Sequence, residues 1–572
     1  MPRHDAGRSA GPGRTAVLPR ALLALALLAG YHLLAPLILA ALAAADLFLL
    51  RGSHSYTLTS LEAYAGSVAV ACSLIRVVYL TRSAAPDPDD LPGLPLTPAA
   101  QPELWYRVTE SARAARTAPP AEIRLIADVN ALVIEDVRLL GLRQGRRRLF
   151  VGAPLLLGMT AAELDAVVAH ELGHYANADT RLAATVWAGR AALERTVGAL
   201  EERAAAHRAR QTAEAEAKAA RRRAQGKPAP VTVRAARGPD HYLGAVYTAY
   251  AKLGLRCTEG VSRRQEYAAD LVAVRIAGRD STAAALRRLT ALGVAAELYA
   301  SRYATMGHDA GLLPPRGQFH GGLALLLADP TRRRELDDLA RRLPEQHRSP
   351  YDSHPPMARR VAVIEALPDD GRRTAGAGPA VGLLREPHAV FAALESMELG
   401  VTSETARRVS WHDLPHRTLR TAHARTAEPL LRAMAEAAAA RGLTLTGPPA
   451  LDTLLDLVDA GMLPEIAALL PMSEAASRST GRAAREFART AFRSRLSALA
   501  VVTLADTGRI RWELSWSGPP VRQVVPDGLA DALEAALDAV IATPPGTAAL
   551  RHLLLSTPPL GGAVHTTTRR LP

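Results

Sequence analysis

The chain opens with a polar segment that is followed by a long apolar run. Residues 1–15 are rich in Gly and Arg and predict a disordered tail, whereas residues 16–50 are almost wholly apolar. A hydrocarbon core of about 30 Å takes roughly 20 helical residues. The run therefore predicts one membrane span near residues 21–43, in a helix that continues beyond it. It is too long for a signal peptide, and a helical hairpin broken at Pro36 is the alternative.

A second apolar run, residues 61–80, is weaker because it contains Glu62 and Arg76. Both lie near its ends, where charged side chains can extend to the membrane surface. The loop between the runs holds only Arg51, whereas four arginines precede or border the first run, namely Arg3, Arg8, Arg14 and Arg20. Positive charge marks the cytoplasmic side. Two spans in the cell membrane then place the N-terminus and everything after Arg82 in the cytoplasm.

Beyond this membrane anchor (residues 16–82), the pattern predicts a mainly α protein with a small β-sheet. Residues 84–102 are rich in Pro and Asp and predict a linker. Helical periodicity dominates from Thr160 to about Leu367, and within it residues 201–237 predict an exposed helix followed by a flexible insert. Strand-like segments precede these helices at Glu122–Ile126, Val129–Val133 and Leu149–Val151.

A second linker, rich in Gly and Pro, divides the rest of the chain. Residues 369–379 separate a domain at residues 83–368 from an α+β accessory domain at residues 380–572. The clearest feature of the accessory domain is a predicted β-hairpin, whose strands are residues 500–504 and the alternating apolar positions of residues 510–516. Nothing in this part of the sequence indicates its function.

Composition and charge narrow the classes of partner. The formal net charge is +13, which fits either nucleic acid or an anionic membrane surface. The membrane is favoured, and no nucleic-acid partner is expected, because the basic residues form no patch interleaved with aromatic residues. The two cysteines, Cys72 and Cys257, lie far apart in the sequence. This fits a reducing compartment and leaves His and carboxylate side chains as candidate metal ligands.

The segment AHELGHYANAD contains two histidines with the spacing of a metal site. Thr160 and Glu163 form a capping-box pattern at the start of its predicted helix. Four residues make about one helical turn, so His170 and His174 project from one side and can share a zinc ion. Glu171 can reach a water on that ion and take its proton as the water attacks a peptide carbonyl. Buried or capping histidines are the alternative, because the pattern fixes only three positions.

A third ligand is needed, because a catalytic zinc ion usually has three protein ligands. Asn177 and Thr180 occupy the positions where the metzincin pattern has Gly and a third His. Downstream, SRRQEYAADLVAVRIAG predicts a helix with Glu266 and Asp270 one turn apart. Glu266 can complete a His₂Glu site, and Asp270 can accept a hydrogen bond from the other ring nitrogen of a ligand, for which His170 is the candidate. An amphipathic helix with two solvated acids is the alternative.

These motifs resemble the HtpX-like and CaaX-prenyl-endopeptidase-type membrane zinc metallopeptidases, a gluzincin group. The resemblance covers about residues 16–367 and includes the apolar runs, the AHELGH and SRRQEYAAD helices and a later SHPPMARR segment. It implies an α+β gluzincin peptidase domain with one zinc ion per chain. The implied zinc ligands are His170, His174 and Glu266, and the implied general base is Glu171.

The resemblance also implies roles for residues outside the two helices. Asn130-Ala131 resembles a pair on a substrate-binding edge strand, to which a peptide adds as a further strand. His354 would donate a hydrogen bond to the oxyanion, held by two prolines at the entry of a helix, and Arg360 would support the site. Taken from the residues alone, Asn130 is a turn residue, His354 a helix cap and Arg360 a surface charge.

Two departures from the resemblance limit what it implies. HtpX-type relatives have two further spans between the zinc helices, but neither residues 181–200 nor residues 241–255 predict a span, because they contain Arg190, Glu194, Arg195 and Lys252. This argues against an enclosed chamber within the membrane and against specificity for prenylated peptides. The resemblance also stops before residue 380.

The sequence therefore predicts a membrane-anchored zinc metalloendopeptidase that acts on protein or peptide substrates at a lipid surface. Membrane-protein quality control is a candidate role. One alternative is a signalling metalloprotease that cleaves a regulator, although its sensor would normally lie outside the cell. The other is a non-catalytic scaffold with a structural zinc site. Glu171 argues against the scaffold, because a structural site needs no general base.

Overall fold

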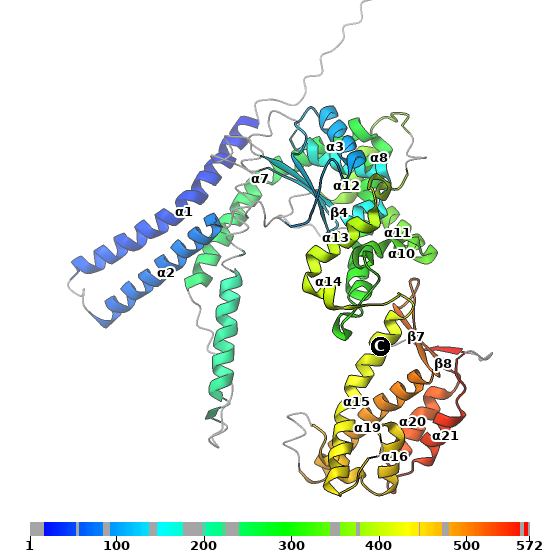
Figure 1. Ribbon diagram of the computed structural model, residues 1–572. Helices are drawn as coiled ribbons and strands as arrows, with labels where there is room; N and C mark the ends of the chain where they lie inside the picture. Colours follow the sequence, from blue (N-terminus) through cyan, green and yellow to red (C-terminus); the bar gives the residue numbers. More distant parts are fainter. Residues whose placement is uncertain are drawn as a thin grey trace, which may run out of the picture. The chain divides into compact units, whose positions relative to one another are not determined.

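The computed structural model is mainly helical with small sheets and two apolar helices near its start, which confirms the predicted fold class (Figure 1). Two compact units divide the chain, Met1–Thr290 with Arg341–Arg385 and Ala291–Ala340 with Glu386–Pro572. The predicted domain boundaries remain a sequence-based division, since compactness groups residues 291–340 with the C-terminal part. The structure describes residues 17–52, 57–83, 92–135, 146–175, 198, 201–219, 221–222, 239–343, 355–372, 378–445, 447–471, 480–560 and 566–569.

The first unit begins with two helices, α1 (Val17–Arg51) and α2 (Leu58–Ser83), which lie side by side (Figure 1). Each has the length and apolar composition to cross a membrane. Helix α1 continues through Pro36, so the alternative of a hairpin broken there is wrong. Between the two helices, Ser67 Oγ donates a 2.9 Å hydrogen bond to Asp46.

A four-stranded sheet follows, in the order β1 (Leu94–Leu96), β2 (Glu122–Ile126), β4 (Arg147–Gly152) and β3 (Ala131–Glu135). Strands β2 and β4 are parallel, whereas β1 and β3 are antiparallel to their neighbours. The three predicted strands are present. Strand β1 lies in the segment predicted to be a linker, where its Pro and Asp content masked a short edge strand. Strand β3 is the opposite edge of the sheet.

Helices around this sheet hold the candidate site. They are α3 (Pro102–Ala114), α4 (Ala153–Gly158), α5 (Ala161–Gly173), α7 (Pro239–Ala277), α12 (Met357–Glu365) and the short helix η6 (Ala380–Leu383). Helix α7 has two roles. Its first half packs against the apolar hairpin, where Leu243 and Tyr247 bury Leu74 of α2. Its second half packs along α5. Residues 201–219 are helical, as predicted, whereas the predicted flexible insert beyond them lies almost wholly outside the described residues.

Helix α8 (Arg279–Tyr299) crosses the division between the units. The second unit then continues through η4 (Ala300–Ala304), η5 (His308–Ala310), β5 (Leu312–Leu313), α9 (Gln318–Gly321), α10 (Leu323–Ala328), α11 (Pro330–Arg342), α13 (Pro387–Leu399), α14 (Val401–Thr405) and β6 (Arg407–Arg408). Strands β5 and β6 pair in parallel.

The C-terminal part of the second unit has its own apolar core, in which Phe492 and Trp512 are among the largest buried side chains. The core lies among α15 (Leu414–Ala440), α16 (Leu451–Asp459), α17 (Leu463–Ala468), α19 (Gly481–Asp506), α20 (Leu529–Val540) and α21 (Ala548–Ser556). A three-stranded sheet adds β7 (Arg511–Leu514), β8 (Val521–Pro526) and β9 (Thr566–Arg569).

The hairpin predicted in this part is wrong in its first strand. Residues 500–504 (AVVTL) belong to the long helix α19: their β-branched residues favour a strand locally, but they continue an Ala-rich helix that buries one apolar face. The second predicted strand exists as β7, with Trp512 buried. It pairs with β8, which follows it in the sequence.

Candidate metal centre

Helix α5 is fixed at its start by the predicted capping box, which the structure confirms. The Thr160 Oγ1 atom accepts the Glu163 N–H at 3.2 Å, and Glu163 Oε2 accepts the Thr160 N–H at 2.8 Å. The helix buries most of its side chains and ends at Gly173. His170 therefore lies in the last turn of the helix and His174 at its C-cap, so both rings lie at the C-terminal end of α5.

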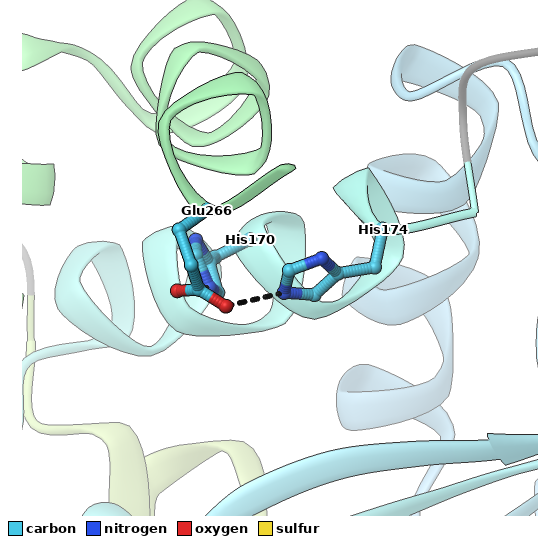
Figure 2. Close-up of side chains that lie close together, drawn as sticks. All are labelled: His170, His174 and Glu266. Atoms are coloured by element: carbon cyan, nitrogen blue, oxygen red, sulfur yellow. Dashed lines mark ion pairs between the residues drawn. The ribbon is translucent and has the colours of Figure 1, made fainter. Parts of the chain in front are cut away.

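A close approach between α5 and α7 brings the third residue to this end of α5. A Cβ atom at Gly173 would lie only 3.1 Å from both the Ala269 Cα and the Val272 Cβ. Without a side chain at Gly173, α7 can lie directly against the helix end. Glu266 lies one helical turn before Ala269, on a part of α7 that faces α5 (Figure 2).

His170, His174 and Glu266 converge on one point (Figure 2). One ligand atom from each residue lies within 4.8 Å of the other two. The Nε2 atoms of His170 and His174 lie 3.6 and 3.7 Å from the two carboxylate oxygens of Glu266. The two rings are nearly perpendicular, at 84°. Glu266 is buried, whereas both histidines are half-buried.

The donor set fits a zinc ion. Two imidazoles and one carboxylate are the ligands of a common catalytic zinc site. With bonds of about 2.0–2.2 Å in a tetrahedral arrangement, donor atoms lie about 3.4 Å apart. The nitrogen-to-oxygen distances of 3.6 and 3.7 Å are close to that separation. These two distances run to different oxygens of Glu266, and the donor atoms as a group span up to 4.8 Å, so the three side chains would have to move closer together to share one ion.

Two charged residues surround the cluster from the buried side. Asp270 Oδ1 lies 3.0 Å from His170 Nδ1, which directs the Nε2 atom toward the cluster. Arg360, from α12, donates Nε and Nη2 to the two Asp270 oxygens at 2.9 and 2.6 Å. Its Nη1 atom lies 3.3 Å from Glu266 Oε2. The buried guanidinium thus contacts both acidic residues of α7 and fixes their side chains relative to each other.

These contacts change the protonation of the cluster. Burial lowers the pKa of His170, but hydrogen bonds to Asp270 and Glu266 outweigh burial and raise this pKa to about 9. Burial also opposes ionisation of Asp270, but hydrogen bonds from His170 and Arg360 hold its pKa below the ordinary value. In the absence of a metal, His170 therefore carries a proton that neutralises the carboxylates. A divalent cation would displace that proton.

Glu171 follows His170 on α5 and is half-buried. Its negative charge contributes to the raised pKa of both His170 and the neighbouring Tyr175.

The residues expected outside the two helices are found in different situations. Asn130 is exposed and directly precedes strand β3, and Ala131 is the first residue of that edge strand. Arg360 is buried at the cluster rather than exposed, with 4% of its surface accessible. His354 lies outside the described residues.

Two residues at this edge had no signal in the sequence. Tyr175 donates its hydroxyl to the Val133 carbonyl of β3 at 2.7 Å, and Arg147 of β4 lies over the Tyr175 ring, 4.7 Å from its centroid. Neither residue belongs to a spaced motif. Only the pairing of strands and the end of α5 bring them together.

The site combines an HExxH helix beside a sheet with a glutamate from a second helix. This arrangement is typical of metallopeptidases. The family model for peptidase family M48 matches residues 98–367, which include both helices and Arg360. The match confirms the expected resemblance to this family and supports a metallopeptidase domain in this region. No curated protein and no solved structure gives a significant match to the chain.

Proposed function

We propose that the protein is a membrane-anchored zinc endopeptidase that cleaves peptide bonds in unfolded or extended segments of proteins. The observation that carries the proposal is the convergence of one ligand atom each from His170, His174 and Glu266 within 4.8 Å. The match of residues 98–367 to the model of peptidase family M48 supports the reaction class.

Each residue of the site has a proposed part in the reaction. Zinc, when bound, lowers the pKa of a coordinated water and polarises the scissile carbonyl. Glu171 acts as the general base that accepts the proton of that water and passes it to the leaving amine. Asp270 holds the His170 ring by its Nδ1 atom. Arg360 keeps Glu266 and Asp270 aligned and balances their charge.

Strand β3 is the proposed substrate-binding edge. It is an outer strand of its sheet, so one side carries backbone groups that a peptide can pair with. The Tyr175 hydroxyl, one residue after His174, reaches this strand, which supports the closeness of the edge to the metal cluster. Asn130 and Ala131 stand at the start of the strand and would bind the peptide there.

His354 is proposed as a hydrogen-bond donor to the oxyanion that forms when the carbonyl is attacked. Support comes from its place in the sequence, just before the two prolines that lead into α12. The same helix brings Arg360 to the cluster. His354 therefore precedes, in the sequence, a helix that supplies another residue of the site.

The membrane anchor supports substrates at a lipid surface and a role in membrane-protein quality control. Tyr247 packs with the apolar hairpin of α1 and α2, and Glu266 follows it on the same helix. At a rise of 1.5 Å per residue, the two lie about 28 Å apart along the helix. One continuous helix thus sets the distance between the anchor and the ligand. This supports cleavage of segments that emerge from the membrane on the cytoplasmic side.

The first test is proteolysis by the purified full-length protein in detergent, with β-casein as an unstructured substrate. We expect internal cleavage that a zinc chelator stops and that one equivalent of zinc restores. A non-catalytic scaffold would bind zinc and leave casein intact. Substrates would then be captured in cells with the Glu171→Gln variant and identified by mass spectrometry, which separates quality control from the cleavage of one regulator.

A further inference from the structure

The open side of strand β3 can be assigned residue by residue. The Gly152 N–H of the neighbouring strand donates to the Asn130 carbonyl at 2.8 Å, so the backbone groups of Asn130 face into the sheet. Backbone groups alternate in direction along an antiparallel strand. Those of Ala131, Val133 and Glu135 therefore face the open edge, where a peptide would pair with them.

The outward-facing backbone groups of these residues differ in whether they already form a hydrogen bond. Tyr175 donates its hydroxyl to the Val133 carbonyl at 2.7 Å. The backbone N–H and C=O of Ala131, by contrast, have no partner on this side among the residues that the structure describes. An amide donor of an added strand would lie about 2.9 Å from a carbonyl oxygen. The Tyr175 hydroxyl therefore takes the place that the next strand's N–H would occupy.

Besides its hydroxyl bond to Val133, Tyr175 is held in this position at two further points. Its carbonyl accepts a hydrogen bond from Thr117 Oγ1 at 3.3 Å, and its ring lies beneath the Arg147 guanidinium. Arg147 is itself fixed, because it donates to Thr117 at 2.7 Å and to Glu135 at 3.3 Å.

We propose that Tyr175 is a specificity-determining residue that ends the substrate-pairing edge at Val133. The inference rests on the proposed peptidase function and on β3 as the edge that receives the substrate. A bound peptide can form backbone hydrogen bonds with Ala131. It cannot form the next one along the strand, because the Tyr175 hydroxyl already occupies the Val133 carbonyl. Extension of the substrate on the side that runs toward Val133 therefore gains no affinity, whereas extension in the other direction can.

The test is a series of quenched fluorescent peptides built around a casein cleavage site and lengthened by one residue at a time on each side. The kcat/KM values are measured for the wild type, Tyr175→Phe, Tyr175→Leu and the control Tyr106→Phe. Tyr106 is an exposed tyrosine on α3, so its variant also loses one hydroxyl. Binding of the same peptides to Glu171→Gln, with and without Tyr175→Phe, is followed by fluorescence anisotropy.

We expect the wild type and Tyr106→Phe to stop gaining kcat/KM on one side of the cleavage site. Tyr175→Phe should restore a gain of about two- to tenfold for the next residue on that side, because one backbone hydrogen bond becomes available. Tyr175→Leu should do the same. Equal length profiles for the wild type and both Tyr175 variants would overturn the inference, and so would a wild type that gains on both sides. If no peptide is cleaved, the proposed function fails, and the anisotropy series decides the inference alone.

Discussion

At the scale of single residues, the site is a balance of buried charge. Asp270 and Glu266 are buried acids, and Arg360 contacts both at distances of 2.6–3.3 Å. An isolated buried charge would cost several kcal/mol, so the arginine is what allows two carboxylates to lie side by side. His170 joins the group through its Nδ1 atom. A zinc ion would bring two positive charges to the cluster and displace the proton of His170.

Asp270→Asn should weaken zinc binding by about 10- to 100-fold, the usual effect of losing a group that orients a metal ligand. The neutral amide is a weaker acceptor for the His170 N–H than the carboxylate is, and it no longer balances the charge of Arg360. Zinc affinity is measured by competition with a chromophoric chelator. Asp280→Asn is the control, because it removes a carboxylate that pairs with Arg279 near the surface. Equal affinities for the two variants would show that Asp270 does not orient His170.

Spacing alone predicted which residues would share a helix face, but not every contact. Two residues one turn apart must project together, which placed His170 with His174 and Glu266 with Asp270. The salt bridge of Arg360 with Asp270 spans 90 residues of sequence, so no local pattern carries it. Tyr175 is a sharper case. Its partner Val133 lies on an edge strand 42 residues earlier, and the bond depends on how the sheet meets the end of α5.

At the scale of elements, the approach of α7 to the end of α5 sets the geometry of the site. The sequence predicted both helices because each has clear apolar periodicity, and the capping box fixed the start of α5. The prediction of a strand at residues 500–504 was wrong because this segment has no clear periodicity. A short apolar run has no period of its own, and burial against α15 favours the helix. Strand β1 was missed because an edge strand of three residues carries little pattern.

Gly173→Ala should lower both stability and metal affinity. The added methyl group would lie 3.1 Å from the Ala269 Cα and the Val272 Cβ, so α7 and its Glu266 must shift by a few tenths of an ångström. Overpacking of this kind costs about 1–3 kcal/mol, and alanine's better helix propensity offsets about 1 kcal/mol. The melting temperature of the zinc-free protein and its zinc affinity are the two measurements.

Gly293→Ala is the matched control for this substitution. Gly293 lies within helix α8, and a Cβ atom there meets nothing within 4 Å, so the variant should be as stable as the wild type or slightly more stable. If Gly173→Ala melts at the wild-type temperature and binds zinc equally well, the close approach does not set the position of Glu266.

At the scale of the whole molecule, the segment that packs against the apolar hairpin and the segment that supplies Glu266 belong to one helix. The sequence predicted two spans and no further span at residues 241–255, and it indicated nothing about what this segment packs against. The structure packs Leu243 and Tyr247 of this segment against the hairpin, which side-chain composition could not reveal because the contact depends on where α7 lies. The function of residues 380–572 is not predicted by sequence or fold.

The orientation in the membrane is a prediction of its own. We expect the catalytic region to lie in the cytoplasm, because four arginines precede or border the first span and only Arg51 occupies the loop between the spans. Paired reporters fused after residue 82, one active only in the cytoplasm and one only outside it, would measure this. Activity of the external reporter would reverse the topology and the proposed location.

In the proposed function, Glu171 is the general base beside a zinc ion held by His170, His174 and Glu266. The most direct measurement is zinc content together with peptide cleavage for the wild type, Glu171→Gln and Glu266→Ala. Glu171→Gln should keep about one zinc ion per chain and lose cleavage, because the ligands remain but no group accepts the proton. Glu266→Ala should lose both. Cleavage by Glu171→Gln within tenfold of the wild type would show that Glu171 is not the general base, and full zinc content in Glu266→Ala would show that Glu266 is not a zinc ligand.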